Sequence, residues 1–188
     1  MANTDRPNGF RFVKTLLGST EPVIRSVGVA NGADIFVGDA LQLSSGLAQR
    51  LAVEGACLGV AVGFGKKDSM SQKGGNAFNP DDLMTRYYDD SANTHTDWVV
   101  YYIPAEGNIF EAQVDDTAET GVVGEAYDIV VGSGSTTTGV SDMEIDGNAL
   151  TNDGDVVIVE IPDIVGNDHT GAYGRYWVKF VNTVFNDA

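Results

Sequence analysis

The residues best suited to metal chemistry form one acidic segment in the last third of the chain. Its oxygen-bearing side chains, glycine and distal carboxylate are Asp142, Glu144, Asp146, Gly147 and Asp153. Carboxylates at alternate positions followed by a glycine imitate a Ca²⁺-binding loop. However, position three of the loop is Glu, the final bidentate Glu is replaced by Asp, and no helical pattern flanks the segment. We therefore predict a half-buried strand, with Met143 and Ile145 inward and the carboxylates in water, and we expect neither a metal nor another cofactor.

Two histidines and one cysteine are the other residues that could carry catalysis. His95 and His169 each stand beside an aspartate, but both lie in polar segments, which predicts exposed loop side chains. Cys57 lies in an apolar run without basic neighbours, so we expect a buried, unreactive thiol. The glycine-rich stretch 59–66 lacks the spacing and the Ser or Thr of a phosphate-binding loop. These features predict that the chain is not an enzyme.

Aromatic side chains gather in short clusters, namely Tyr87–Tyr88, Trp98, Tyr101–Tyr102 and Tyr173–Trp177. Carbohydrate-binding modules use exposed rings as platforms for sugars. Because these residues alternate within expected strands, at least half of each cluster should belong to the core. A carbohydrate-binding β-sandwich is therefore the alternative function. A hydrolase would need two carboxylates across a cleft and is the weakest alternative.

Net charge is −16 and is distributed unevenly along the chain. Residues 1–80 contain eight Lys/Arg and six Asp/Glu, a balance of +2, whereas residues 81–188 contain three and twenty-one, a balance of −18. A body this acidic repels phosphate backbones, so nucleic acid is not an expected partner. No apolar run reaches the roughly 18 residues of a membrane span, and the N-terminus lacks the apolar core of a secretory signal. We expect synthesis in the cytoplasm, no membrane partner, and a contact side in the near-neutral N-terminal part.

Short apolar runs punctuated by glycine predict an all-β fold, an antiparallel barrel or sandwich of about eight to nine strands. Candidate strands are 23–30, 35–37, 40–43, 56–64, 98–103, 109–114, 122–131, the segment around Met143, 156–161 and 176–185. The pair 98–103 and 109–114, joined by the turn 104–108, predicts a β-hairpin. The run 56–64 is apolar on both faces and should lie centrally. The best helix candidate is the short segment 45–53.

The domain organisation expected is an extended arm, residues 1–22, followed by a single β-rich body, residues 23–188. A long loop, 65–97, lies within the body and carries at most one helical turn, near 81–87. The first fourteen residues space apolar anchors and cations along an extended backbone, which suits contact with another protein. The candidate contact residues are Arg6, Phe10, Arg11, Phe12, Lys14 and Arg25. We expect the two rings to fill pockets of the partner, and deletion of residues 1–20 to leave a folded body.

The opening segment 1–14 resembles the start of the capsid decoration (cement) proteins of tailed bacteriophages. The likeness continues in the segments 35–41, 56–60, 124–128 and 139–141. This resemblance implies a virion structural protein on the outer face of the assembled capsid, where it binds the major capsid protein without catalysis. Such a protein would bridge neighbouring capsid subunits and stabilise the lattice. We expect its copies to associate as a homo-oligomer on the capsid, which would add avidity. In the alternative, the carbohydrate-binding β-sandwich would lie on the virion surface and mediate attachment to the host.

Overall fold

The structure is a computed structural model that describes residues 3–66, 86–91, 93, 95–117, 123–151 and 154–185. Within these ranges the chain forms thirteen β-strands and one single-turn 3-10 helix, η1 (His95–Asp97), and contains no α-helix. All pairings within the three sheets are antiparallel. The all-β, antiparallel class expected from the sequence is confirmed.

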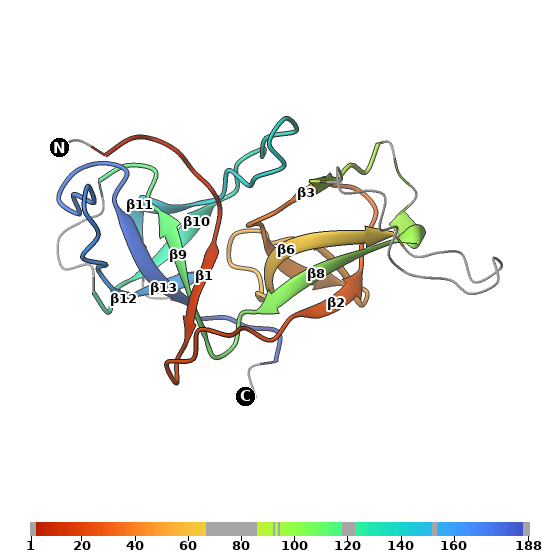
Figure 1. The fold of residues 1–188 in the computed structure, drawn as a ribbon, viewed down its shortest axis with the longest axis horizontal. Helices are drawn as coiled ribbons and strands as arrows, with labels where there is room; N and C mark the ends of the chain where they lie inside the picture. The colour runs from red at the N-terminus through yellow and green to blue at the C-terminus, as the bar shows by residue number, and fades with distance from the viewer. Residues whose placement is uncertain are drawn as a thin grey trace.

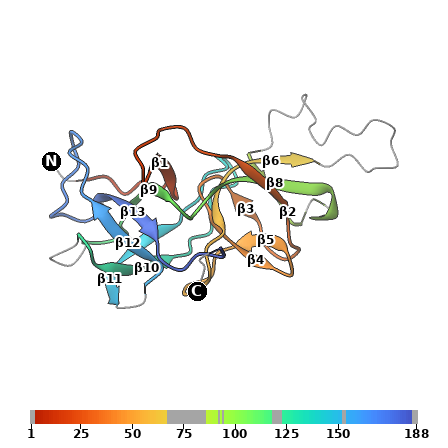
Figure 2. The same ribbon diagram turned by 90° about the horizontal axis from the view of Figure 1, so that it is seen from below.

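Two large sheets and one small one make up the body (Figure 1). The six-stranded sheet has the order β1 (Arg11–Thr15), β9 (Asn108–Gln113), β13 (Arg175–Phe180), β12 (Val156–Glu160), β10 (Ala126–Val130) and β11 (Glu144–Thr151). The five-stranded sheet has the order β2 (Arg25–Gly28), β8 (Trp98–Pro104), β6 (Gly59–Lys66), β4 (Ala40–Ser44) and β5 (Leu47–Arg50). The small sheet pairs β3 (Ile35–Phe36) with β7 (Tyr87–Tyr88). The two large sheets lie side by side (Figures 1 and 2), an arrangement consistent with a β-sandwich. Isolated parallel bridges, Val29 with Ala48 and Val114 with Ile145, add a link between β2 and β5 and between β9 and β11.

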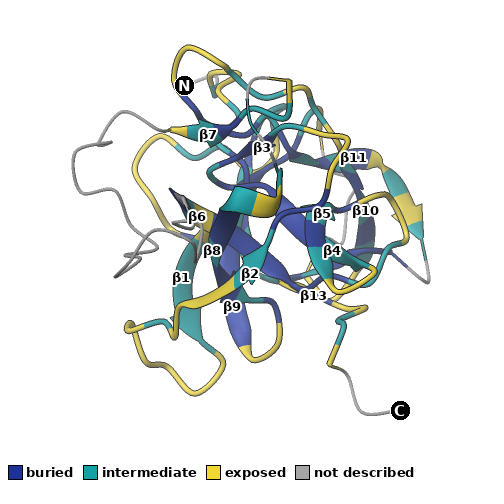
Figure 3. Cartoon of the chain, turned by 90° about the vertical axis from the view of Figure 1, so that its right-hand side faces the viewer, coloured by how far each residue is buried: buried dark blue, intermediate teal, exposed yellow. Residues whose placement is uncertain are grey.

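The hydrophobic core consists of two clusters, and the larger one joins the two sheets. Phe110 and Val178 of the six-stranded sheet share this cluster with Ala40 and Val60 of the five-stranded sheet. Figure 3 shows the buried strands in dark blue and the exposed connections in yellow. Removal of this apolar surface from water is the main driving force for the fold.

Three strands lie where the sequence predicted something else, so the strand count exceeds the expected eight to nine. They are β1 in the expected arm, β5 in the expected helix and β7 in the expected long loop. In place of the helix 45–53, the structure has a hairpin of β4 and β5. Ser45 and Gly46 form its turn with φ values of 52° and 81°. Positive φ at both positions is what a two-residue type I′ turn requires.

The expected hairpin between 98–103 and 109–114 is wrong, although both strands exist. β8 lies between β2 and β6, whereas β9 lies between β1 and β13 in the other sheet. The chain turns at Gly107, whose φ is 72°, and Asn108 Nδ2 donates to the Pro104 carbonyl at 2.8 Å. Both strands are almost entirely buried. Each therefore needs a neighbour on both edges, and long-range pairing overrides the local turn signal.

The acidic segment at Asp142 is a strand, as predicted. Met143 and Ile145 are fully buried, and exposure alternates along β11. The run 56–64 also behaves as predicted, because β6 is the central strand of the five-stranded sheet. Of the expected loop 65–97, residues 67–85, 92 and 94 lie outside the described residues, as does most of the expected helical turn near 81–87. In the described ranges no helical segment has the length and apolar character of a membrane span.

The N-terminal segment belongs to the body instead of forming a separate arm. β1 pairs with β9, and the Phe10 N–H donates to the Gly38 carbonyl at 2.8 Å. The Phe10 side chain is 1% exposed and its ring lies 5.0 Å from that of Phe180. Phe12 packs against the same cluster. Both rings are thus committed to the protein's own core, which corrects the expectation that they fill pockets of a partner.

A division between arm and body at residue 22 also does not describe this structure. β1 belongs to the six-stranded sheet, and the next strand, β2, belongs to the five-stranded sheet (Figure 1). The connection between them crosses from one sheet to the other (Figure 2). Deletion of residues 1–20 would remove an edge strand and a core ring, so we no longer expect the truncated chain to fold as the intact body does.

A buried ion pair within the five-stranded sheet lies against the segments that flank β10 and β11 of the other sheet. Arg50 Nε on β5 lies 3.0 Å from Asp39 Oδ2, and Arg50 Nη2 donates to Asp39 Oδ1 at 3.5 Å. The Asp39 carboxylate also accepts from the Phe36 N–H at 2.8 Å and from the Ser141 hydroxyl at 2.5 Å. Arg50 donates in addition to the Gly132 carbonyl. Burial raises the pKa of Asp39, and the Arg50 charge opposes this effect.

Candidate interaction surface

The solvent face of the six-stranded sheet carries an unusual set of side chains where β1, β9 and β13 pair. Arg11 on β1 lies opposite Glu111 on β9, which in turn lies opposite Trp177 on β13. Because alternate residues of a strand point to opposite faces, the next positions along the same strands, Phe12 and Val178, pack inward on the core. Alternation therefore turns the charged residues and Trp177 to the outside.

Trp177 lies at the centre of this face, beneath a lysine. Lys14 Nζ lies 4.4 Å from the centre of the Trp177 ring and 3.1 Å from Glu160 Oε2. A cation over an indole face is favourable because the ring quadrupole attracts it. The Trp177 Nε1 is buried and has no hydrogen-bond partner among the described residues. A large half-buried ring with cations around it is the usual composition of a binding hot spot.

Three arginines converge beside Trp177 around a small hollow of about 10 Å³, which Arg6, Arg11, Arg175 and Glu111 line together. Arg175 Nη1 lies 3.4 Å from Glu111 Oε1, and both side chains are partly exposed. With Lys14 and with Lys179, which is exposed on β13, these arginines form what we call the basic face. Its members are Arg6, Arg11, Lys14, Arg175, Trp177 and Lys179.

The basic face opposes the charge of the whole molecule. It gathers five of the eleven Lys/Arg of a chain whose net charge is −16. Its two carboxylates, Glu111 and Glu160, are each paired with a cation. Arg6, Arg11 and Lys179 form no ion pair with any residue that the structure describes. This face can therefore attract an acidic surface that the remainder of the molecule would repel.

A glutamine fixes the N-terminal segment at the margin of the basic face. The Arg6 N–H donates to Gln113 Oε1 at 3.2 Å, and Gln113 Nε2 donates to Asp5 Oδ1 at 3.2 Å and to Glu144 Oε1 at 3.0 Å. Partial burial, helped by the negative charges of Asp5 and Asp115, raises the pKa of Glu144 to about 7. The cluster thus holds two carboxylates close together and changes its charge near neutral pH.

The predicted contact residues fall into three groups. Arg6, Arg11 and Lys14 lie together on the basic face. Phe10 and Phe12 point to the core. Arg25 is exposed but lies on β2, in the other sheet.

Half of the basic face was missed from the sequence, namely Arg175, Trp177 and Lys179. Their signal was available, because outward Arg, Trp and Lys alternate with buried Tyr176, Val178 and Phe180 along β13. What the sequence could not provide was the strand order β1-β9-β13. This order places β1 and β13, which are more than 150 residues apart in the sequence, on either side of β9.

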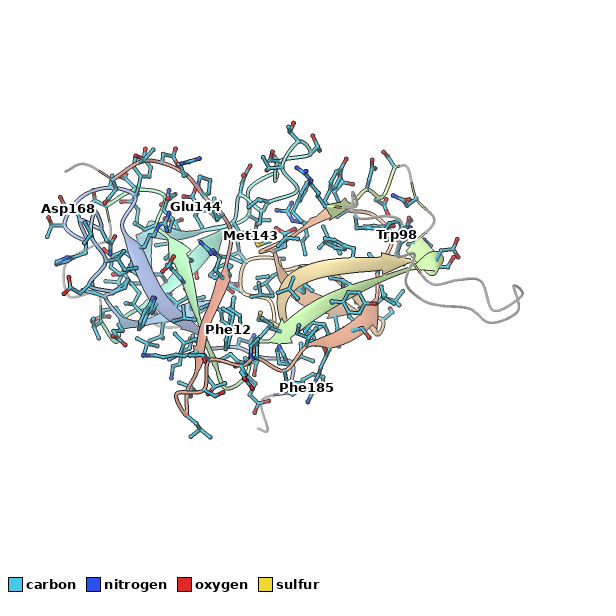
Figure 4. All side chains as sticks on the ribbon, in the orientation of Figure 1. Phe12, Trp98, Met143, Glu144, Asp168 and Phe185 are labelled. Carbon is cyan, nitrogen blue, oxygen red and sulfur yellow. The ribbon has the colours of Figure 1, made fainter. Side chains whose placement is uncertain are left out.

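The other candidate groups do not assemble into a reactive site. His169 is the neighbour of Asp168 in the chain, and η1, which contains His95, ends just before Trp98. Asp168 and Trp98 lie at opposite ends of the molecule (Figure 4), so the two histidines are far apart. His169 is exposed as expected, whereas His95 is partly buried. The Cys57 thiol is buried as expected, and burial raises its pKa well above its usual range. Among the described residues no three His, Cys, Asp or Glu side chains are placed to hold a metal ion.

The aromatic clusters are largely internal, as the alternation predicted. Tyr88, Trp98, Tyr102 and Tyr176 are buried, and Tyr87 stacks on Phe36 with ring centres 4.9 Å apart.

Comparison with models of known protein families, with curated proteins and with solved structures gives no significant match to this chain. The function must therefore be argued from the geometry above.

Proposed function

We propose that the protein is a non-catalytic structural component of a phage head, which binds the outer face of the assembled capsid through its basic face. One observation carries this proposal: five cations and a half-buried tryptophan share one sheet face of a strongly acidic protein. The resemblance of the segment 1–14 to decoration proteins supports the major capsid protein as the partner.

The charge distribution supports an oriented contact. A body of net charge −16 is repelled by an acidic surface except where its own cations gather. Arg11 and Lys179 are exposed, so they would steer association and fix orientation more than they add affinity. Trp177 is better placed to supply affinity, because its half-buried ring offers a large apolar area that a partner can cover.

Binding to the assembled lattice would stabilise the capsid by mass action. A ligand that binds the assembled shell and not the separate subunits shifts the equilibrium toward the shell. One protein that contacts two neighbouring subunits bridges them, and association of copies around a symmetry axis would add avidity.

The test is sedimentation of the purified protein with expanded heads of the phage that carries its gene, followed by imaging of the decorated particles. We expect Trp177→Ala to weaken binding about 30-fold, and the double variant Arg11→Glu/Lys179→Glu to weaken it at least about 10-fold, more so at low salt.

The matched control for the single variant Arg11→Glu is Arg25→Glu, which makes the same charge change on an exposed strand outside the basic face. We expect this variant to bind as the wild type does. Equal losses for Arg25→Glu and Arg11→Glu would reduce the effect to net charge, and full binding by the Trp177→Ala/Arg11→Glu/Lys179→Glu variant would refute the proposal.

A further inference from the structure

A polar hollow lies where the N-terminal segment meets the β12–β13 connection. Its volume is about 310 Å³. Thr4 and Arg6 line it from one side, and Ile164, Val165, Tyr173 and Arg175 line it from the other. The volume is near the lower end of the range for small-molecule sites and suits a ligand of monosaccharide size.

The charges around this hollow select for an anion. Two of the lining side chains are arginines, and none of the lining residues that the structure describes is Asp or Glu. The lining of the hollow thus differs in charge from the whole chain, in which 27 Asp/Glu outnumber 11 Lys/Arg. Arg175 already forms an ion pair, because its Nη1 lies 3.4 Å from Glu111 Oε1. The Arg6 guanidinium has no ion pair with a described residue. A planar guanidinium binds a carboxylate with two parallel hydrogen bonds.

Tyr173 lines the hollow in a strained backbone conformation. Its φ is 62°, which aromatic residues rarely adopt. The Tyr173 N–H donates to the Asp116 carbonyl at 3.2 Å, which helps to hold that conformation. Backbone strain of this kind tends to be kept where it serves a binding site. The ring is only partly buried, and beside it Ile164 is 43% exposed and Val165 is 103% exposed.

We propose that this hollow is a binding site for an acidic sugar, meaning a pyranose ring that bears a carboxylate. The carboxylate would lie between Arg6 and Arg175, the ring would lie against Tyr173 and the apolar rim, and Thr4 would bond a hydroxyl. The charges favour a carboxylate over a neutral sugar, and the aromatic and apolar walls favour a ring over a bare ion. The proposal does not depend on capsid binding, because it needs only the residues of this hollow.

The test is calorimetric or NMR titration of the full chain with D-glucuronic acid and with N-acetylneuraminic acid. Glucose and acetate are the matched probes that lack the carboxylate and the ring, respectively. We expect a Kd on the order of 1 mM for the better acidic sugar, and at least about 10-fold weaker binding of glucose and of acetate. Equal binding of acetate or glucose, or no binding of either acidic sugar, would overturn the proposal.

Two variants locate the site. Tyr173→Gly removes the ring and relieves the backbone strain, so the protein should fold at least as well while its affinity falls about 10-fold. Arg6→Gln should lower affinity to a similar extent, whereas Lys179→Gln, a cation outside the hollow, should not change it. Unchanged affinity in both Tyr173→Gly and Arg6→Gln, or tighter binding of an acidic peptide than of either sugar, would count against a sugar site. Capsid binding by Tyr173→Gly should be normal, so the two proposals can fail separately.

Discussion

Glu144 changes its charge in the range where most carboxylates are already ionised. Its pKa of about 7 lies above the ordinary value of 4.5 because the carboxyl is partly buried and faces Asp5 and Asp115. The folded protein therefore holds this proton more tightly than the unfolded chain. The contribution of Glu144 to stability is accordingly lost as pH rises from about 4.5 to about 7 and stays lost above that.

Replacement of Glu144 by Gln should remove this pH dependence. At pH 8 we expect Glu144→Gln to raise the free energy of unfolding by roughly 1 kcal/mol, a value discounted for partial exposure, and near pH 4 we expect no difference. Denaturant unfolding of both proteins between pH 4 and 8 measures the difference, in which the contributions of other carboxyls cancel. A constant difference across this range would show that Glu144 does not titrate there.

Replacement of Phe10 tests whether the N-terminal segment belongs to the core or docks on another protein. The Phe10 ring is 1% exposed and packs against Phe180, so Phe10→Ala should lower the free energy of unfolding by about 3–5 kcal/mol. Its neighbour Arg11 is exposed, and Arg11→Ala should change stability by no more than about 0.5 kcal/mol. Chemical denaturation of the two variants tests this contrast. Near-wild-type stability of Phe10→Ala would mean that the ring is free to contact another protein.

At the scale of elements, two glycines with positive φ flank β1, Gly9 before it and Gly18 after it. A Cβ on Gly9 would lie 2.4 Å from the Gly38 carbonyl oxygen, and Gly9 has a φ of 63°. Gly18, in the connection after β1, also has positive φ, at 89°, but a Cβ there would meet nothing within 4 Å. The two positions therefore differ in steric room while sharing the left-handed backbone.

Alanine at these two positions should separate crowding from backbone strain. We expect Gly18→Ala to cost about 1 kcal/mol, from the backbone conformation alone. Gly9→Ala should cost about 2 kcal/mol more, because β1 must move away from Gly38. Thermal unfolding of both variants is the measurement. Equal costs would show that the approach of the two backbones is looser than the structure has it.

The elements that the sequence predicted well are those with a strong local pattern. Met143 and Ile145 alternate with carboxylates, which is sufficient to identify β11. The errors arose where a local signal competed with long-range pairing. The segment 45–53 was predicted to be a short helix, but its first two residues, Ser45 and Gly46, form a type I′ turn. The turn residues after Pro104 predicted a hairpin of β8 with β9. In the structure each of these strands instead pairs on both edges with other strands, and the two lie in different sheets.

At the scale of the whole molecule, the Asp39–Arg50 pair of the five-stranded sheet contacts the other sheet through hydrogen bonds with Ser141 and Gly132. Asp39 is fully buried and also accepts hydrogen bonds from Phe36 and Ser141. Removal of Arg50 leaves that buried carboxylate without its counter-charge, so Arg50→Met should cost about 3–5 kcal/mol. The double variant Asp39→Asn/Arg50→Met should recover a large part of this loss, because the remaining amide is neutral.

Denaturant unfolding of the single and double variants forms a complete thermodynamic cycle. A coupling energy near zero would mean that the interaction between Asp39 and Arg50 adds nothing net to the free energy of unfolding. The carboxylate of Asp155 should be unaffected in either case, because it accepts from the backbone N–H groups of Glu54 and Ile129 elsewhere between the sheets.

The basic face shows the limit of prediction at this scale. The cations of the N-terminal segment were identified from their spacing, because they lie close together in the sequence. Arg175, Trp177 and Lys179 join them only through the order β1-β9-β13, which sets the two ends of the chain beside one another. No local pattern contains that order, since strand pairing across such separations depends on the packing of the entire core.

The division of β1 and β2 between two sheets has a consequence for how the chain is made. Among the described residues, β1 pairs with β9 and β2 with β8. β2 therefore cannot pair until about residue 104 has left the ribosome, and β1 cannot pair until about residue 113 has done so. At roughly 5–20 residues per second, the leader with its two phenylalanines waits on the order of 5–20 s for its partners. During that interval the apolar side chains of the N-terminal segment are exposed to solvent or to chaperones. Because the strand pairing is mostly between residues far apart in the sequence, we expect the chain to fold slowly after synthesis ends.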